Sequence, residues 1–391
     1  MLWRKAMGAL WLTCTASVSV YRWTLFLLLT VQVPFFACGQ GNPQILWMNG
    51  GHSEVVNSVA FSRDGQYLAS AGRDRTIKLW RVSDWRLTRT LVGHTLEVLA
   101  VAFSSDGQYL ASGGRDQTVR IWRVADGSPV RTLTSTAHTI FSVAFSPDGQ
   151  YLVSGHGDAV RLWRVSDGQL IHAWQFTPIN FFSVAFSPDG ALVAAASGDG
   201  YVRVWRVADR TLRFIWSIGF SSALSVAFSP DGQRLAASTL RGAVHLWRMT
   251  DGSEERVWTG LWGSTAAVAF TPDGQYLVAG SEDRRVRFWR VVDGQLAFAI
   301  TTQSALISLA CSPNGRYLAT TSWDSRLLAW RVADQQLECI LSAHTRSVNG
   351  VAYSPDGALL ASGDEDGNLH LWRAAGGAPI RALARQSLSV T

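Results

Sequence analysis

The chain has 391 residues, of which 47% are hydrophobic and 16% are charged. That balance supplies enough apolar surface for a large core and excludes an intrinsically disordered chain. The formal net charge is +6, but three basic residues lie within the first 22 positions, so the rest of the chain carries about +3 (6 − 3), too little to indicate nucleic-acid binding.

Residues 1–39 are expected to form a signal peptide or another membrane-targeting segment. Residues 7–37 are almost entirely apolar, and the run from Trp23 to Ala37 is short for a membrane span, which needs about 20 residues, but fits a signal peptide. Cleavage before Gln40 is the expected outcome, and lipidation of Cys38 or an uncleaved anchor are the alternatives. The mature protein would then be periplasmic, at the cell surface or membrane-anchored, and cytoplasmic only if translation begins later than the first methionine.

From residue 44 onward one sequence unit recurs eight times. Its most regular part is Val59–Gly65, and the glycine that ends each copy follows the previous one after 41 or 42 residues. Each copy is followed by a Trp-Arg pair. The eight tryptophans of these pairs are Trp80, Trp122, Trp163, Trp205, Trp247, Trp289, Trp330 and Trp372. A period of about 40–45 residues is typical of the four-stranded blades of a β-propeller.

The first unit illustrates the expected strands. Residues 59–61 belong to an apolar run that ends in a turn, residues 67–70 form a second strand, residues 76–80 a third and residues 86–91 an outer fourth. The turn ends in glycine, which accepts the left-handed conformation. Because a blade cannot bury both of its faces alone, we predict that residues 40–391 form one all-β domain, an eight-bladed β-propeller with four antiparallel strands per blade.

Two segments compete for the fourth strand of the last blade. Residues 44–48 precede the first unit, and residues 379–383 resemble the outer strand at 129–133. We expect residues 44–48 to take this place, since pairing of the two chain ends would close the ring and leave no free sheet edge. The segment at 379–383 is the alternative.

These repeats resemble the Trp-Asp (WD) repeat family over residues 44–385, in a tandem form like that of bacterial members. The resemblance implies a structural tetrad in each blade: a histidine before the first strand, a serine or threonine in the second, an aspartate in the following turn and the tryptophan of the third. Three blades carry it at identical spacing: His52, Ser70, Asp74 and Trp80; His94, Ser112, Asp116 and Trp122; His344, Ser362, Asp366 and Trp372. A fourth set has shifted spacing: His138, Ser154, Asp158 and Trp163. In later blades the histidine is absent and Ala195, Ala237 and Ala279 replace the serine.

The sequence departs from the family in that arginine, not aspartate, follows all eight tryptophans. Seven of these arginines have an aspartate three residues later, as in Arg81 and Asp84. We expect local ion pairs, which contribute little each. A ring of arginines that contacts anionic lipid or nucleic acid is the alternative.

A serine, a histidine and an aspartate in one blade could suggest a hydrolase, but the trio recurs together with a tryptophan and no serine lies in a G-x-S-x-G turn. We therefore expect no catalytic residue and no enzymatic activity. No CxxC pair, Cys/His cluster or other metal motif occurs, so we expect no metal and no cofactor. Cys311 and Cys339 fall on the first and fourth strands of one blade, too far apart for a disulfide.

The expected function is that of a monomeric, non-catalytic, exported scaffold that binds a protein or peptide. An enzyme or small-ligand binder acting in the central channel is the alternative. The resemblance implies that partners contact the face with the loops before the first strand and the turns between the second and third. The positions expected to bind the partner are Leu99, Phe141, Phe182, Leu224, Ile307, Trp323, Arg73 and Arg115. We expect no nucleic-acid partner, and membrane contact only through the N-terminal segment.

Phe141 and Phe182 are the expected anchors on this face, because aromatic residues in exposed apolar patches tend to dominate binding. The alternative is that these side chains close the mouth of the channel as part of the core.

Overall fold

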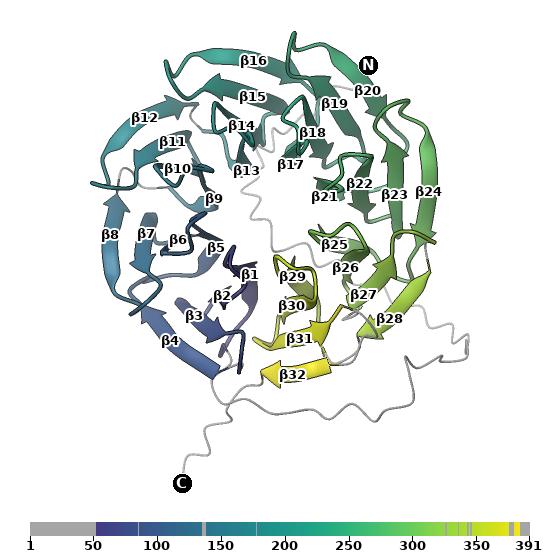
Figure 1. Ribbon diagram of the computed structural model, residues 1–391. Helices are drawn as coiled ribbons and strands as arrows, with labels where there is room; N and C mark the ends of the chain where they lie inside the picture. Colours follow the sequence, from purple (N-terminus) through teal and green to yellow (C-terminus); the bar gives the residue numbers. More distant parts are fainter. Residues whose placement is uncertain are drawn as a thin grey trace, which may run out of the picture. The chain divides into compact units, whose positions relative to one another are not determined.

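The computed structural model describes residues 52–84, 86–134, 138–176, 178–324, 327–334, 336–341, 344, 346–374 and 379–383. These residues form eight separate four-stranded antiparallel sheets, each made of four consecutive strands. The sheets stand as blades around a central opening (Figure 1), so the predicted eight-bladed β-propeller is confirmed. Blade 1 comprises β1–β4, and the numbering continues to blade 8 with β29–β32. Within the described ranges no helix has the length and apolarity to cross a membrane.

Each blade contributes one strand to each of four layers, from the axis outward. The first strands are β1 (Val56–Phe61), β5 (Val98–Phe103), β9 (Ile140–Phe145), β13 (Phe181–Phe186), β17 (Ala223–Phe228), β21 (Thr265–Phe270), β25 (Leu306–Cys311) and β29 (Val348–Tyr353). The second strands are β2 (Tyr67–Gly72), β6 (Tyr109–Gly114), β10 (Tyr151–His156), β14 (Leu192–Ser197), β18 (Arg234–Thr239), β22 (Tyr276–Ser281), β26 (Tyr317–Ser322) and β30 (Leu359–Asp364).

The third strands are β3 (Thr76–Arg81), β7 (Thr118–Arg123), β11 (Ala159–Arg164), β15 (Tyr201–Arg206), β19 (Val244–Arg248), β23 (Arg285–Arg290), β27 (Leu327–Arg331) and β31 (Leu369–Arg373). The outer strands are β4 (Arg86–Val92), β8 (Pro129–Thr134), β12 (Leu170–Gln175), β16 (Leu212–Ser217), β20 (Glu254–Trp258), β24 (Leu296–Thr301), β28 (Leu337–Leu341) and β32 (Pro379–Leu383).

The turn between the first and second strands explains why its sequence hardly varies. In blade 1 the Ser62 hydroxyl donates a 2.6 Å hydrogen bond to Asp64 and accepts one of 2.9 Å from the Tyr67 N–H. Gly65 has a φ of 69°, and the glycines at this position in the other blades have φ of 67° to 73°. Since side chains other than glycine are strained there, the same short sequence is needed in every blade.

The ring closes differently from our expectation. β32 pairs with β31 and completes blade 8, so the place we assigned to residues 44–48 is taken, and that assignment was wrong. Residues 379–383 follow the third strand directly, so their pairing needs only a short loop, whereas pairing the chain ends needs long-range closure. Blades 8 and 1 instead meet through buried side chains, among them Leu68 and Trp80 of blade 1 and Leu371 of blade 8. Residues 44–48 lie outside the described residues.

The predicted tetrads of blades 1 and 2 are closed hydrogen-bond networks. In blade 1, His52 contacts Asp74 at 2.9 Å through Nδ1 and Ser70 at 2.8 Å through Nε2, and Trp80 Nε1 donates to the same serine at 3.2 Å. In blade 2 the four members His94, Ser112, Asp116 and Trp122 are joined by bonds of 2.7–2.9 Å. Because the indole N–H donates to the serine, the serine hydroxyl can donate to the histidine, whose second N–H then donates to the aspartate.

Blade 8 requires a correction. His344 contacts Ser362 and Asp364, both at 2.7 Å, and Trp372 donates to Ser362, whereas Asp366, which we had assigned to the tetrad, contacts Arg346 at 3.0 Å. Asp364 occupies the position that is Gly72 in blade 1, two residues after the serine. A side chain at that position points at the histidine, since a Cβ placed on Gly72 would meet the His52 ring. The carboxylate of Asp364 therefore takes the place on the histidine that the turn aspartate occupies in blades 1 and 2.

Blade 3 differs from its predicted set for the same reason. His156, two residues after Ser154, contacts that serine at 2.7 Å, and Trp163 donates to it at 2.8 Å. His138 is 41% exposed and lies 4.0 Å from Asp158. Asp158 instead accepts two bonds, of 2.8 and 2.6 Å, from the buried Arg161.

Arginines of the third strand take over the role of the missing histidine in further blades. Arg203 of blade 4 donates to Asp199 at 2.6 Å and to Ser197 at 2.7 Å. Arg287 of blade 6 donates to Asp283 at 2.6 Å. Arg161, Arg203 and Arg287 each stand two positions before the Trp-Arg tryptophan of their blade, so the same position of the repeat supplies the cation in all three blades.

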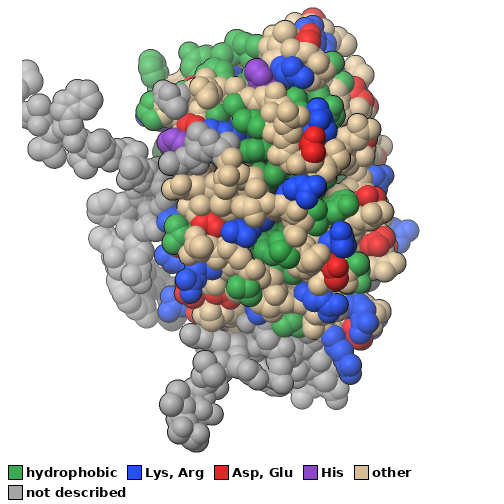
Figure 2. All heavy atoms as spheres, turned by 90° about the vertical axis from the view of Figure 1, so that its left-hand side faces the viewer, with side chains coloured by type: hydrophobic (Ala, Val, Ile, Leu, Met, Phe, Trp, Pro, Cys, Tyr) green, Lys and Arg blue, Asp and Glu red, His purple; other side chains and the backbone are tan. Residues whose placement is uncertain are grey.

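The arginines that follow the tryptophans are mostly paired as expected. Ion pairs of 2.6–3.4 Å join Arg81, Arg123, Arg164, Arg248, Arg290 and Arg331 to the aspartate three residues later. Arg206 instead contacts Thr211. The hydrogen bond from Arg81 lowers the pKa of Asp84 to about 2. Figure 2 shows basic and acidic side chains interspersed on the side of the ring that carries β8 and β12.

Cys311 and Cys339 lie on β25 and β28, the two edge strands of blade 7, as the sequence predicts. Cys311 forms no disulfide. Burial raises the pKa of its thiol to about 12, so it stays protonated and unreactive at neutral pH.

Candidate partner-binding surface

One face of the ring, here called the loop face, collects the loop that precedes each first strand and the turn between the second and third strands. In every blade one backbone N–H of that turn donates to a carbonyl of the preceding loop, at 2.8–3.2 Å. In blade 1 the bond runs from Arg73 to Val55, and in blade 7 from Trp323 to Ala305. These bonds fix eight loops and eight turns side by side at the mouth of the central channel.

The first strand of every blade contains a β-bulge directly after its first residue. The residues at the eight bulges are Asn57, Leu99, Phe141, Phe182, Leu224, Ala266, Ile307 and Asn349. A bulge leaves one residue out of the pairing and redirects its side chain. Five of the eight positions predicted to bind the partner, from Leu99 to Ile307, are therefore bulge residues, and all five are half-buried.

Phe141 and Phe182 come from neighbouring blades and touch each other. Their ring centroids are 5.6 Å apart at an interplanar angle of 71°, an edge-to-face arrangement. Such pairs add about 0.5–1.5 kcal/mol to the burial of the rings. The two rings thus support each other and still present part of their surface on the loop face.

The two predicted arginines share one acidic partner. Arg73 contacts Glu97 at 2.8 Å and Arg115 contacts the same carboxylate at 3.3 Å. Arg73 also lies 3.8 Å from Glu54, so two arginines and two carboxylates balance each other at this edge of the face. Trp323, on the turn of blade 7, lies apart from this group and is 51% exposed.

The sequence analysis missed the most exposed aromatic residues of the loop face. Phe220 and Trp262, in the loops before β17 and β21, are 96% and 84% exposed. Their loops lack the tetrad histidine and contain glycine, Gly219 beside Phe220 and Gly263 beside Trp262. An aromatic residue outside the repeated positions, in a loop that has lost its histidine, was the available signal.

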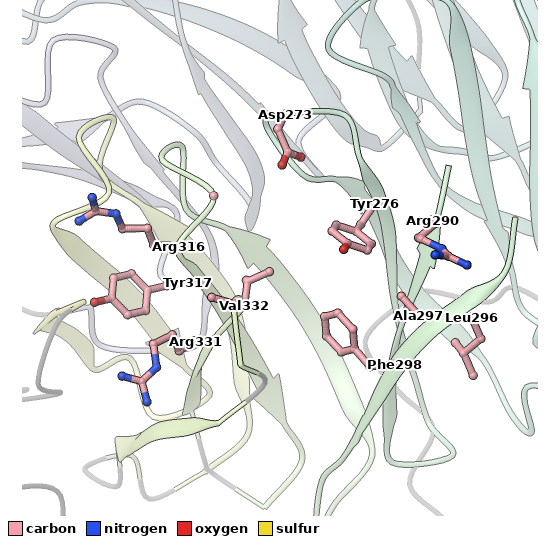
Figure 3. A pocket seen from close by; sticks show the side chains of 12 residues that line it. Asp273, Tyr276, Arg290, Leu296, Ala297, Phe298, Arg316, Tyr317, Arg331 and Val332 are labelled. Atoms are coloured by element: carbon pink, nitrogen blue, oxygen red, sulfur yellow. The ribbon is translucent and has the colours of Figure 1, made fainter. Parts of the chain in front are cut away.

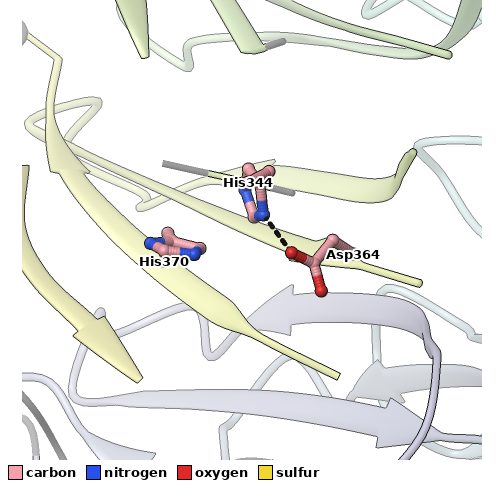
Figure 4. A group of neighbouring side chains, drawn as sticks. All are labelled: His344, Asp364 and His370. Carbon is pink, nitrogen blue, oxygen red and sulfur yellow. Dashed lines mark hydrogen bonds and ion pairs between the residues drawn. The ribbon is translucent and has the colours of Figure 1, made fainter. Parts of the chain in front are cut away.

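One group of ligand-type side chains in the described ranges is close enough to consider for a metal. The candidate ligand atoms of His344, Asp364 and His370 lie within 4.8 Å of one another (Figure 4). Both nitrogens of His344 are engaged, one by Asp364 and one by Ser362. A metal ion would have to break this tetrad, so the group fits a structural network better than a metal site. The tetrad serines Ser70, Ser112 and Ser362 are fully buried, so no substrate can reach their hydroxyl groups.

A cavity of about 720 Å³ lies between blades 6 and 7. Figure 3 shows Tyr276 and Phe298 on one side and Val332 on the other, with the side chains of Arg316 and Arg331 directed away from Phe298. Arg331 is paired with Asp334 at 2.9 Å. The cavity therefore combines apolar side chains with charged ones, since Asp273 and Arg290 also line it.

Comparisons with known proteins agree with this architecture. A family profile described as the first β-propeller of IFT122 matches residues 55–222. The profile of the WD domain, G-beta repeat, matches residues 212–248, 257–290, 296–331 and 335–373. The crystal structure of the computationally designed Ika8 protein is similar, with a TM-score of 0.76 and 25% identity over 84% of this chain and 99% of that one.

Curated relatives match over single repeats. Protein HIR1 of Mycosarcoma maydis is 51% identical over 41 residues, or 10% of this chain and 4% of that protein. WD repeat-containing protein 55 of Pongo abelii is 36% identical over 56 residues, or 14% of this chain and 15% of that protein. Ribosome assembly protein 4 of Saccharomyces cerevisiae is 50% identical over 40 residues, or 10% of this chain and 8% of that protein. The eight blades, their tetrads and these matches show that the chain belongs to the WD-repeat β-propeller family.

Proposed function

We propose that the protein is a non-catalytic scaffold that binds a protein or peptide on the loop face. The observation that supports the proposal is the row of bulges that holds Leu99, Phe141, Phe182 and Leu224 of four consecutive blades at the loop-face ends of their first strands. Apolar side chains grouped at a surface within a polar rim are typical of interaction sites. The rigid ring holds them without an ordering cost on binding.

The polar surroundings of this row favour a peptide over a purely apolar ligand. Arg73, Arg115 and Glu97 supply charged groups at one edge, and the exposed Phe220 and Trp262 extend the apolar surface beyond the row on the side of blades 5 and 6. Aromatic anchors with a charged rim are common at protein interfaces.

We further propose that the ring acts outside the cytoplasm, as a monomer. This part rests on the composition of residues 1–39. N-terminal sequencing of the protein from its native cell envelope is expected to find a start near Gln40. An intact Met1 on protein recovered from the cytoplasm would contradict it.

The binding test combines Phe141→Ala with Phe182→Ala. The native protein is used to capture partners from the cell envelope, and the partner identified is then titrated against purified variants. Each phenylalanine is expected to contribute about 2 kcal/mol or more, so the double variant should lose most of its affinity. Ile215→Ala, at an exposed position on β16, is the matched control and should bind normally.

Thermal unfolding of the same variants separates the two roles of the pair. A double variant that melts like the wild type and no longer binds supports the proposal. A double variant that melts like the wild type and still binds would overturn it. If the double variant unfolds, Leu224→Ser provides the second test, because it removes one apolar bulge residue without disturbing the aromatic pair.

A further inference from the structure

A second cavity, of about 470 Å³, opens on the face opposite the loop face. Its lining comes from five consecutive blades: Phe61, Phe103, Phe145, Phe186 and Phe228 are the last residues of β1, β5, β9, β13 and β17. These strands follow one another around the central opening (Figure 1), so one cavity can touch all five only at the channel. The cavity is therefore the channel mouth beside the turns between first and second strands.

The wall of this mouth is apolar along the first strands and polar at the turns. Besides the five phenylalanines it includes Ala144, Val184 and Ala185 of the first strands, and Ser104, Ser105, Ser146 and Ser187 of the turns. The phenylalanines are half-buried, so each keeps part of its ring surface available in the mouth. These rings offer an aliphatic chain an apolar surface, and removing that surface from water favours binding.

One cation, Arg63, is among the residues that line this mouth. Arg63 belongs to the first turn of blade 1 and is exposed. The equivalent residues of the other blades are uncharged: Ser105, Pro147, Pro188, Pro230, Pro272, Pro313 and Pro355. Within the part of the chain that the structure describes, no ion pair or side-chain hydrogen bond engages the Arg63 guanidinium. The nearest acidic residue in sequence, Asp64, is already held by the Ser62 hydroxyl at 2.6 Å.

We propose that this mouth binds a long-chain carboxylate, with the aliphatic chain among the phenylalanines and the carboxylate on Arg63. Arginine binds carboxylates in a two-pronged geometry, and a free guanidinium near five phenylalanine rings matches a ligand with one charged end and one apolar body. The cavity volume lies within the range of about 300–1,000 Å³ common for small-molecule sites. The site lies on the other face from the proposed partner surface, so it stands or falls independently of that function.

The test uses the full-length protein and a fluorescent fatty-acid probe, 11-(dansylamino)undecanoic acid. Saturable binding of one probe per chain is expected, with displacement by palmitate. Hexadecanol, which has the same chain and no charge, is expected to displace the probe at least tenfold less well. Displacement by palmitate and hexadecanol at equal concentrations would overturn the role of the cation.

Variants locate the site. Arg63→Ser introduces the residue that blade 2 has at this position, and it is expected to weaken palmitate by roughly ten- to a hundredfold while leaving hexadecanol unchanged. Arg86→Ser, an exposed arginine on the outer strand of the same blade, is the control and should change neither. Ala185→Phe narrows the mouth and should weaken both ligands.

Two outcomes contradict the proposal. If Arg63→Ser and Arg86→Ser bind palmitate equally, the carboxylate does not sit on Arg63. If the full-length chain shows no saturable binding, the mouth does not take this ligand. Thermal unfolding of each variant confirms that any loss of binding occurs in a folded ring.

Discussion

Blades 8, 1 and 2 hold their central tryptophan by a hydrogen bond, whereas blades 4, 5 and 6 hold it by stacking. In the first group the indole N–H donates to a serine of the second strand, within the tetrad. In the second group that serine is replaced by alanine, and the tryptophan lies against another tryptophan from the outer strand of the preceding blade. The stacked pairs are Trp174 with Trp205, Trp216 with Trp247 and Trp258 with Trp289, at centroid distances of 4.7–4.9 Å.

A hydroxyl partner and a stacked tryptophan do not occur together at any central tryptophan among the described residues. Where the outer strand of the preceding blade carries an aliphatic residue, the tryptophan has a hydroxyl partner. Leu91 lies in one core cluster with Trp122, which donates to Ser112. In the same way Leu133 lies with Trp163, which donates to Ser154, and Ile300 lies with Trp330, which donates to Thr320. The loss of serine in Ala195, Ala237 and Ala279 is thus matched in each case by a tryptophan one blade earlier.

The difference also changes what each tryptophan connects. The tetrad lies within one blade, but the outer tryptophans join two blades, since Trp216 stacks on Trp247 and donates to the carbonyl of Gly252 in the next blade at 2.8 Å. Trp174 and Trp258 donate in the same way at 2.8 and 2.9 Å. Blades 3–6 are therefore linked to one another by stacked tryptophans. Blades 8, 1 and 2 meet through buried side chains without such a pair, and each of them holds its tryptophan by an internal polar network.

The largest effect should come from removing a histidine of the polar group. His94→Ala removes the buried partner of the Asp116 carboxylate, whose side chain is 2% exposed, and leaves that carboxylate only the bonds from Thr95 and Thr118. Breaking a buried pair by removing one partner costs about 3–5 kcal/mol of unfolding free energy. His138→Ala, in the corresponding loop of blade 3 but outside the network, should cost no more than about 0.5 kcal/mol. Urea unfolding measures both, and equal losses would contradict the distinction.

Trp216→Leu converts one stacked junction into the aliphatic kind. It should cost about 2–4 kcal/mol of unfolding free energy, because it removes a stacked ring and a hydrogen bond between blades. Adding Ala237→Ser should recover part of the loss by giving Trp247 a hydroxyl partner. Trp262→Leu, at an exposed tryptophan, is the control. A double-mutant cycle with no coupling between the first two changes would show that serine and stacking are not alternatives.

Low pH should first destabilise the blades whose tryptophan is held by a tetrad. Burial by itself would raise the pKa of Asp116, but the hydrogen bond and charge of His94, with bonds from Thr95 and Thr118, lower it to about 2. A folded pKa below the ordinary value of 3.8 gives a stabilisation that is complete above that value and is lost as the pH falls toward 2. The stability difference between wild type and Asp116→Asn, followed by chemical unfolding, should therefore shrink between pH 4 and pH 2. A difference that is constant over this range would contradict the assignment.

The smallest expected effect is a gain in stability, from replacing His370. His370 of blade 8 is buried, its Nε2 has no partner among the described residues, and burial lowers its pKa to about 3. Blade 7 has the buried Leu328 at the equivalent position. His370→Leu should raise the unfolding free energy by up to about 1 kcal/mol, since it removes an unsatisfied buried polar atom. The reverse change, Leu328→His, should lower it, and a loss of stability in His370→Leu would mean that this histidine has a structural partner.

The blade count and strand order could be read from the sequence because they depend on local signals. The turn that begins at Ser62 and ends at Gly65 needs the same few residues in every blade, and a fixed spacing to the Trp-Arg pair sets the hairpins that follow. The tetrads of blades 1 and 2 followed from the same regularity. On the loop face, the repeat identified the positions of Leu99 to Ile307 but gave no indication of the bulges that redirect them.

Only the tertiary structure decided which side chains meet where the repeat is irregular. The contact of His344 with Asp364, the replacement of His138 by His156 and the buried pair of Arg161 with Asp158 depend on direction and distance between strands. Residues on adjacent blades, such as Trp216 and Trp247, are about 30 positions apart, and the exposure of Phe220 depends on what neighbouring loops leave uncovered. A repeated sequence fixes contacts within one unit, because those recur at constant spacing, but contacts between unlike units are set by the packed ring.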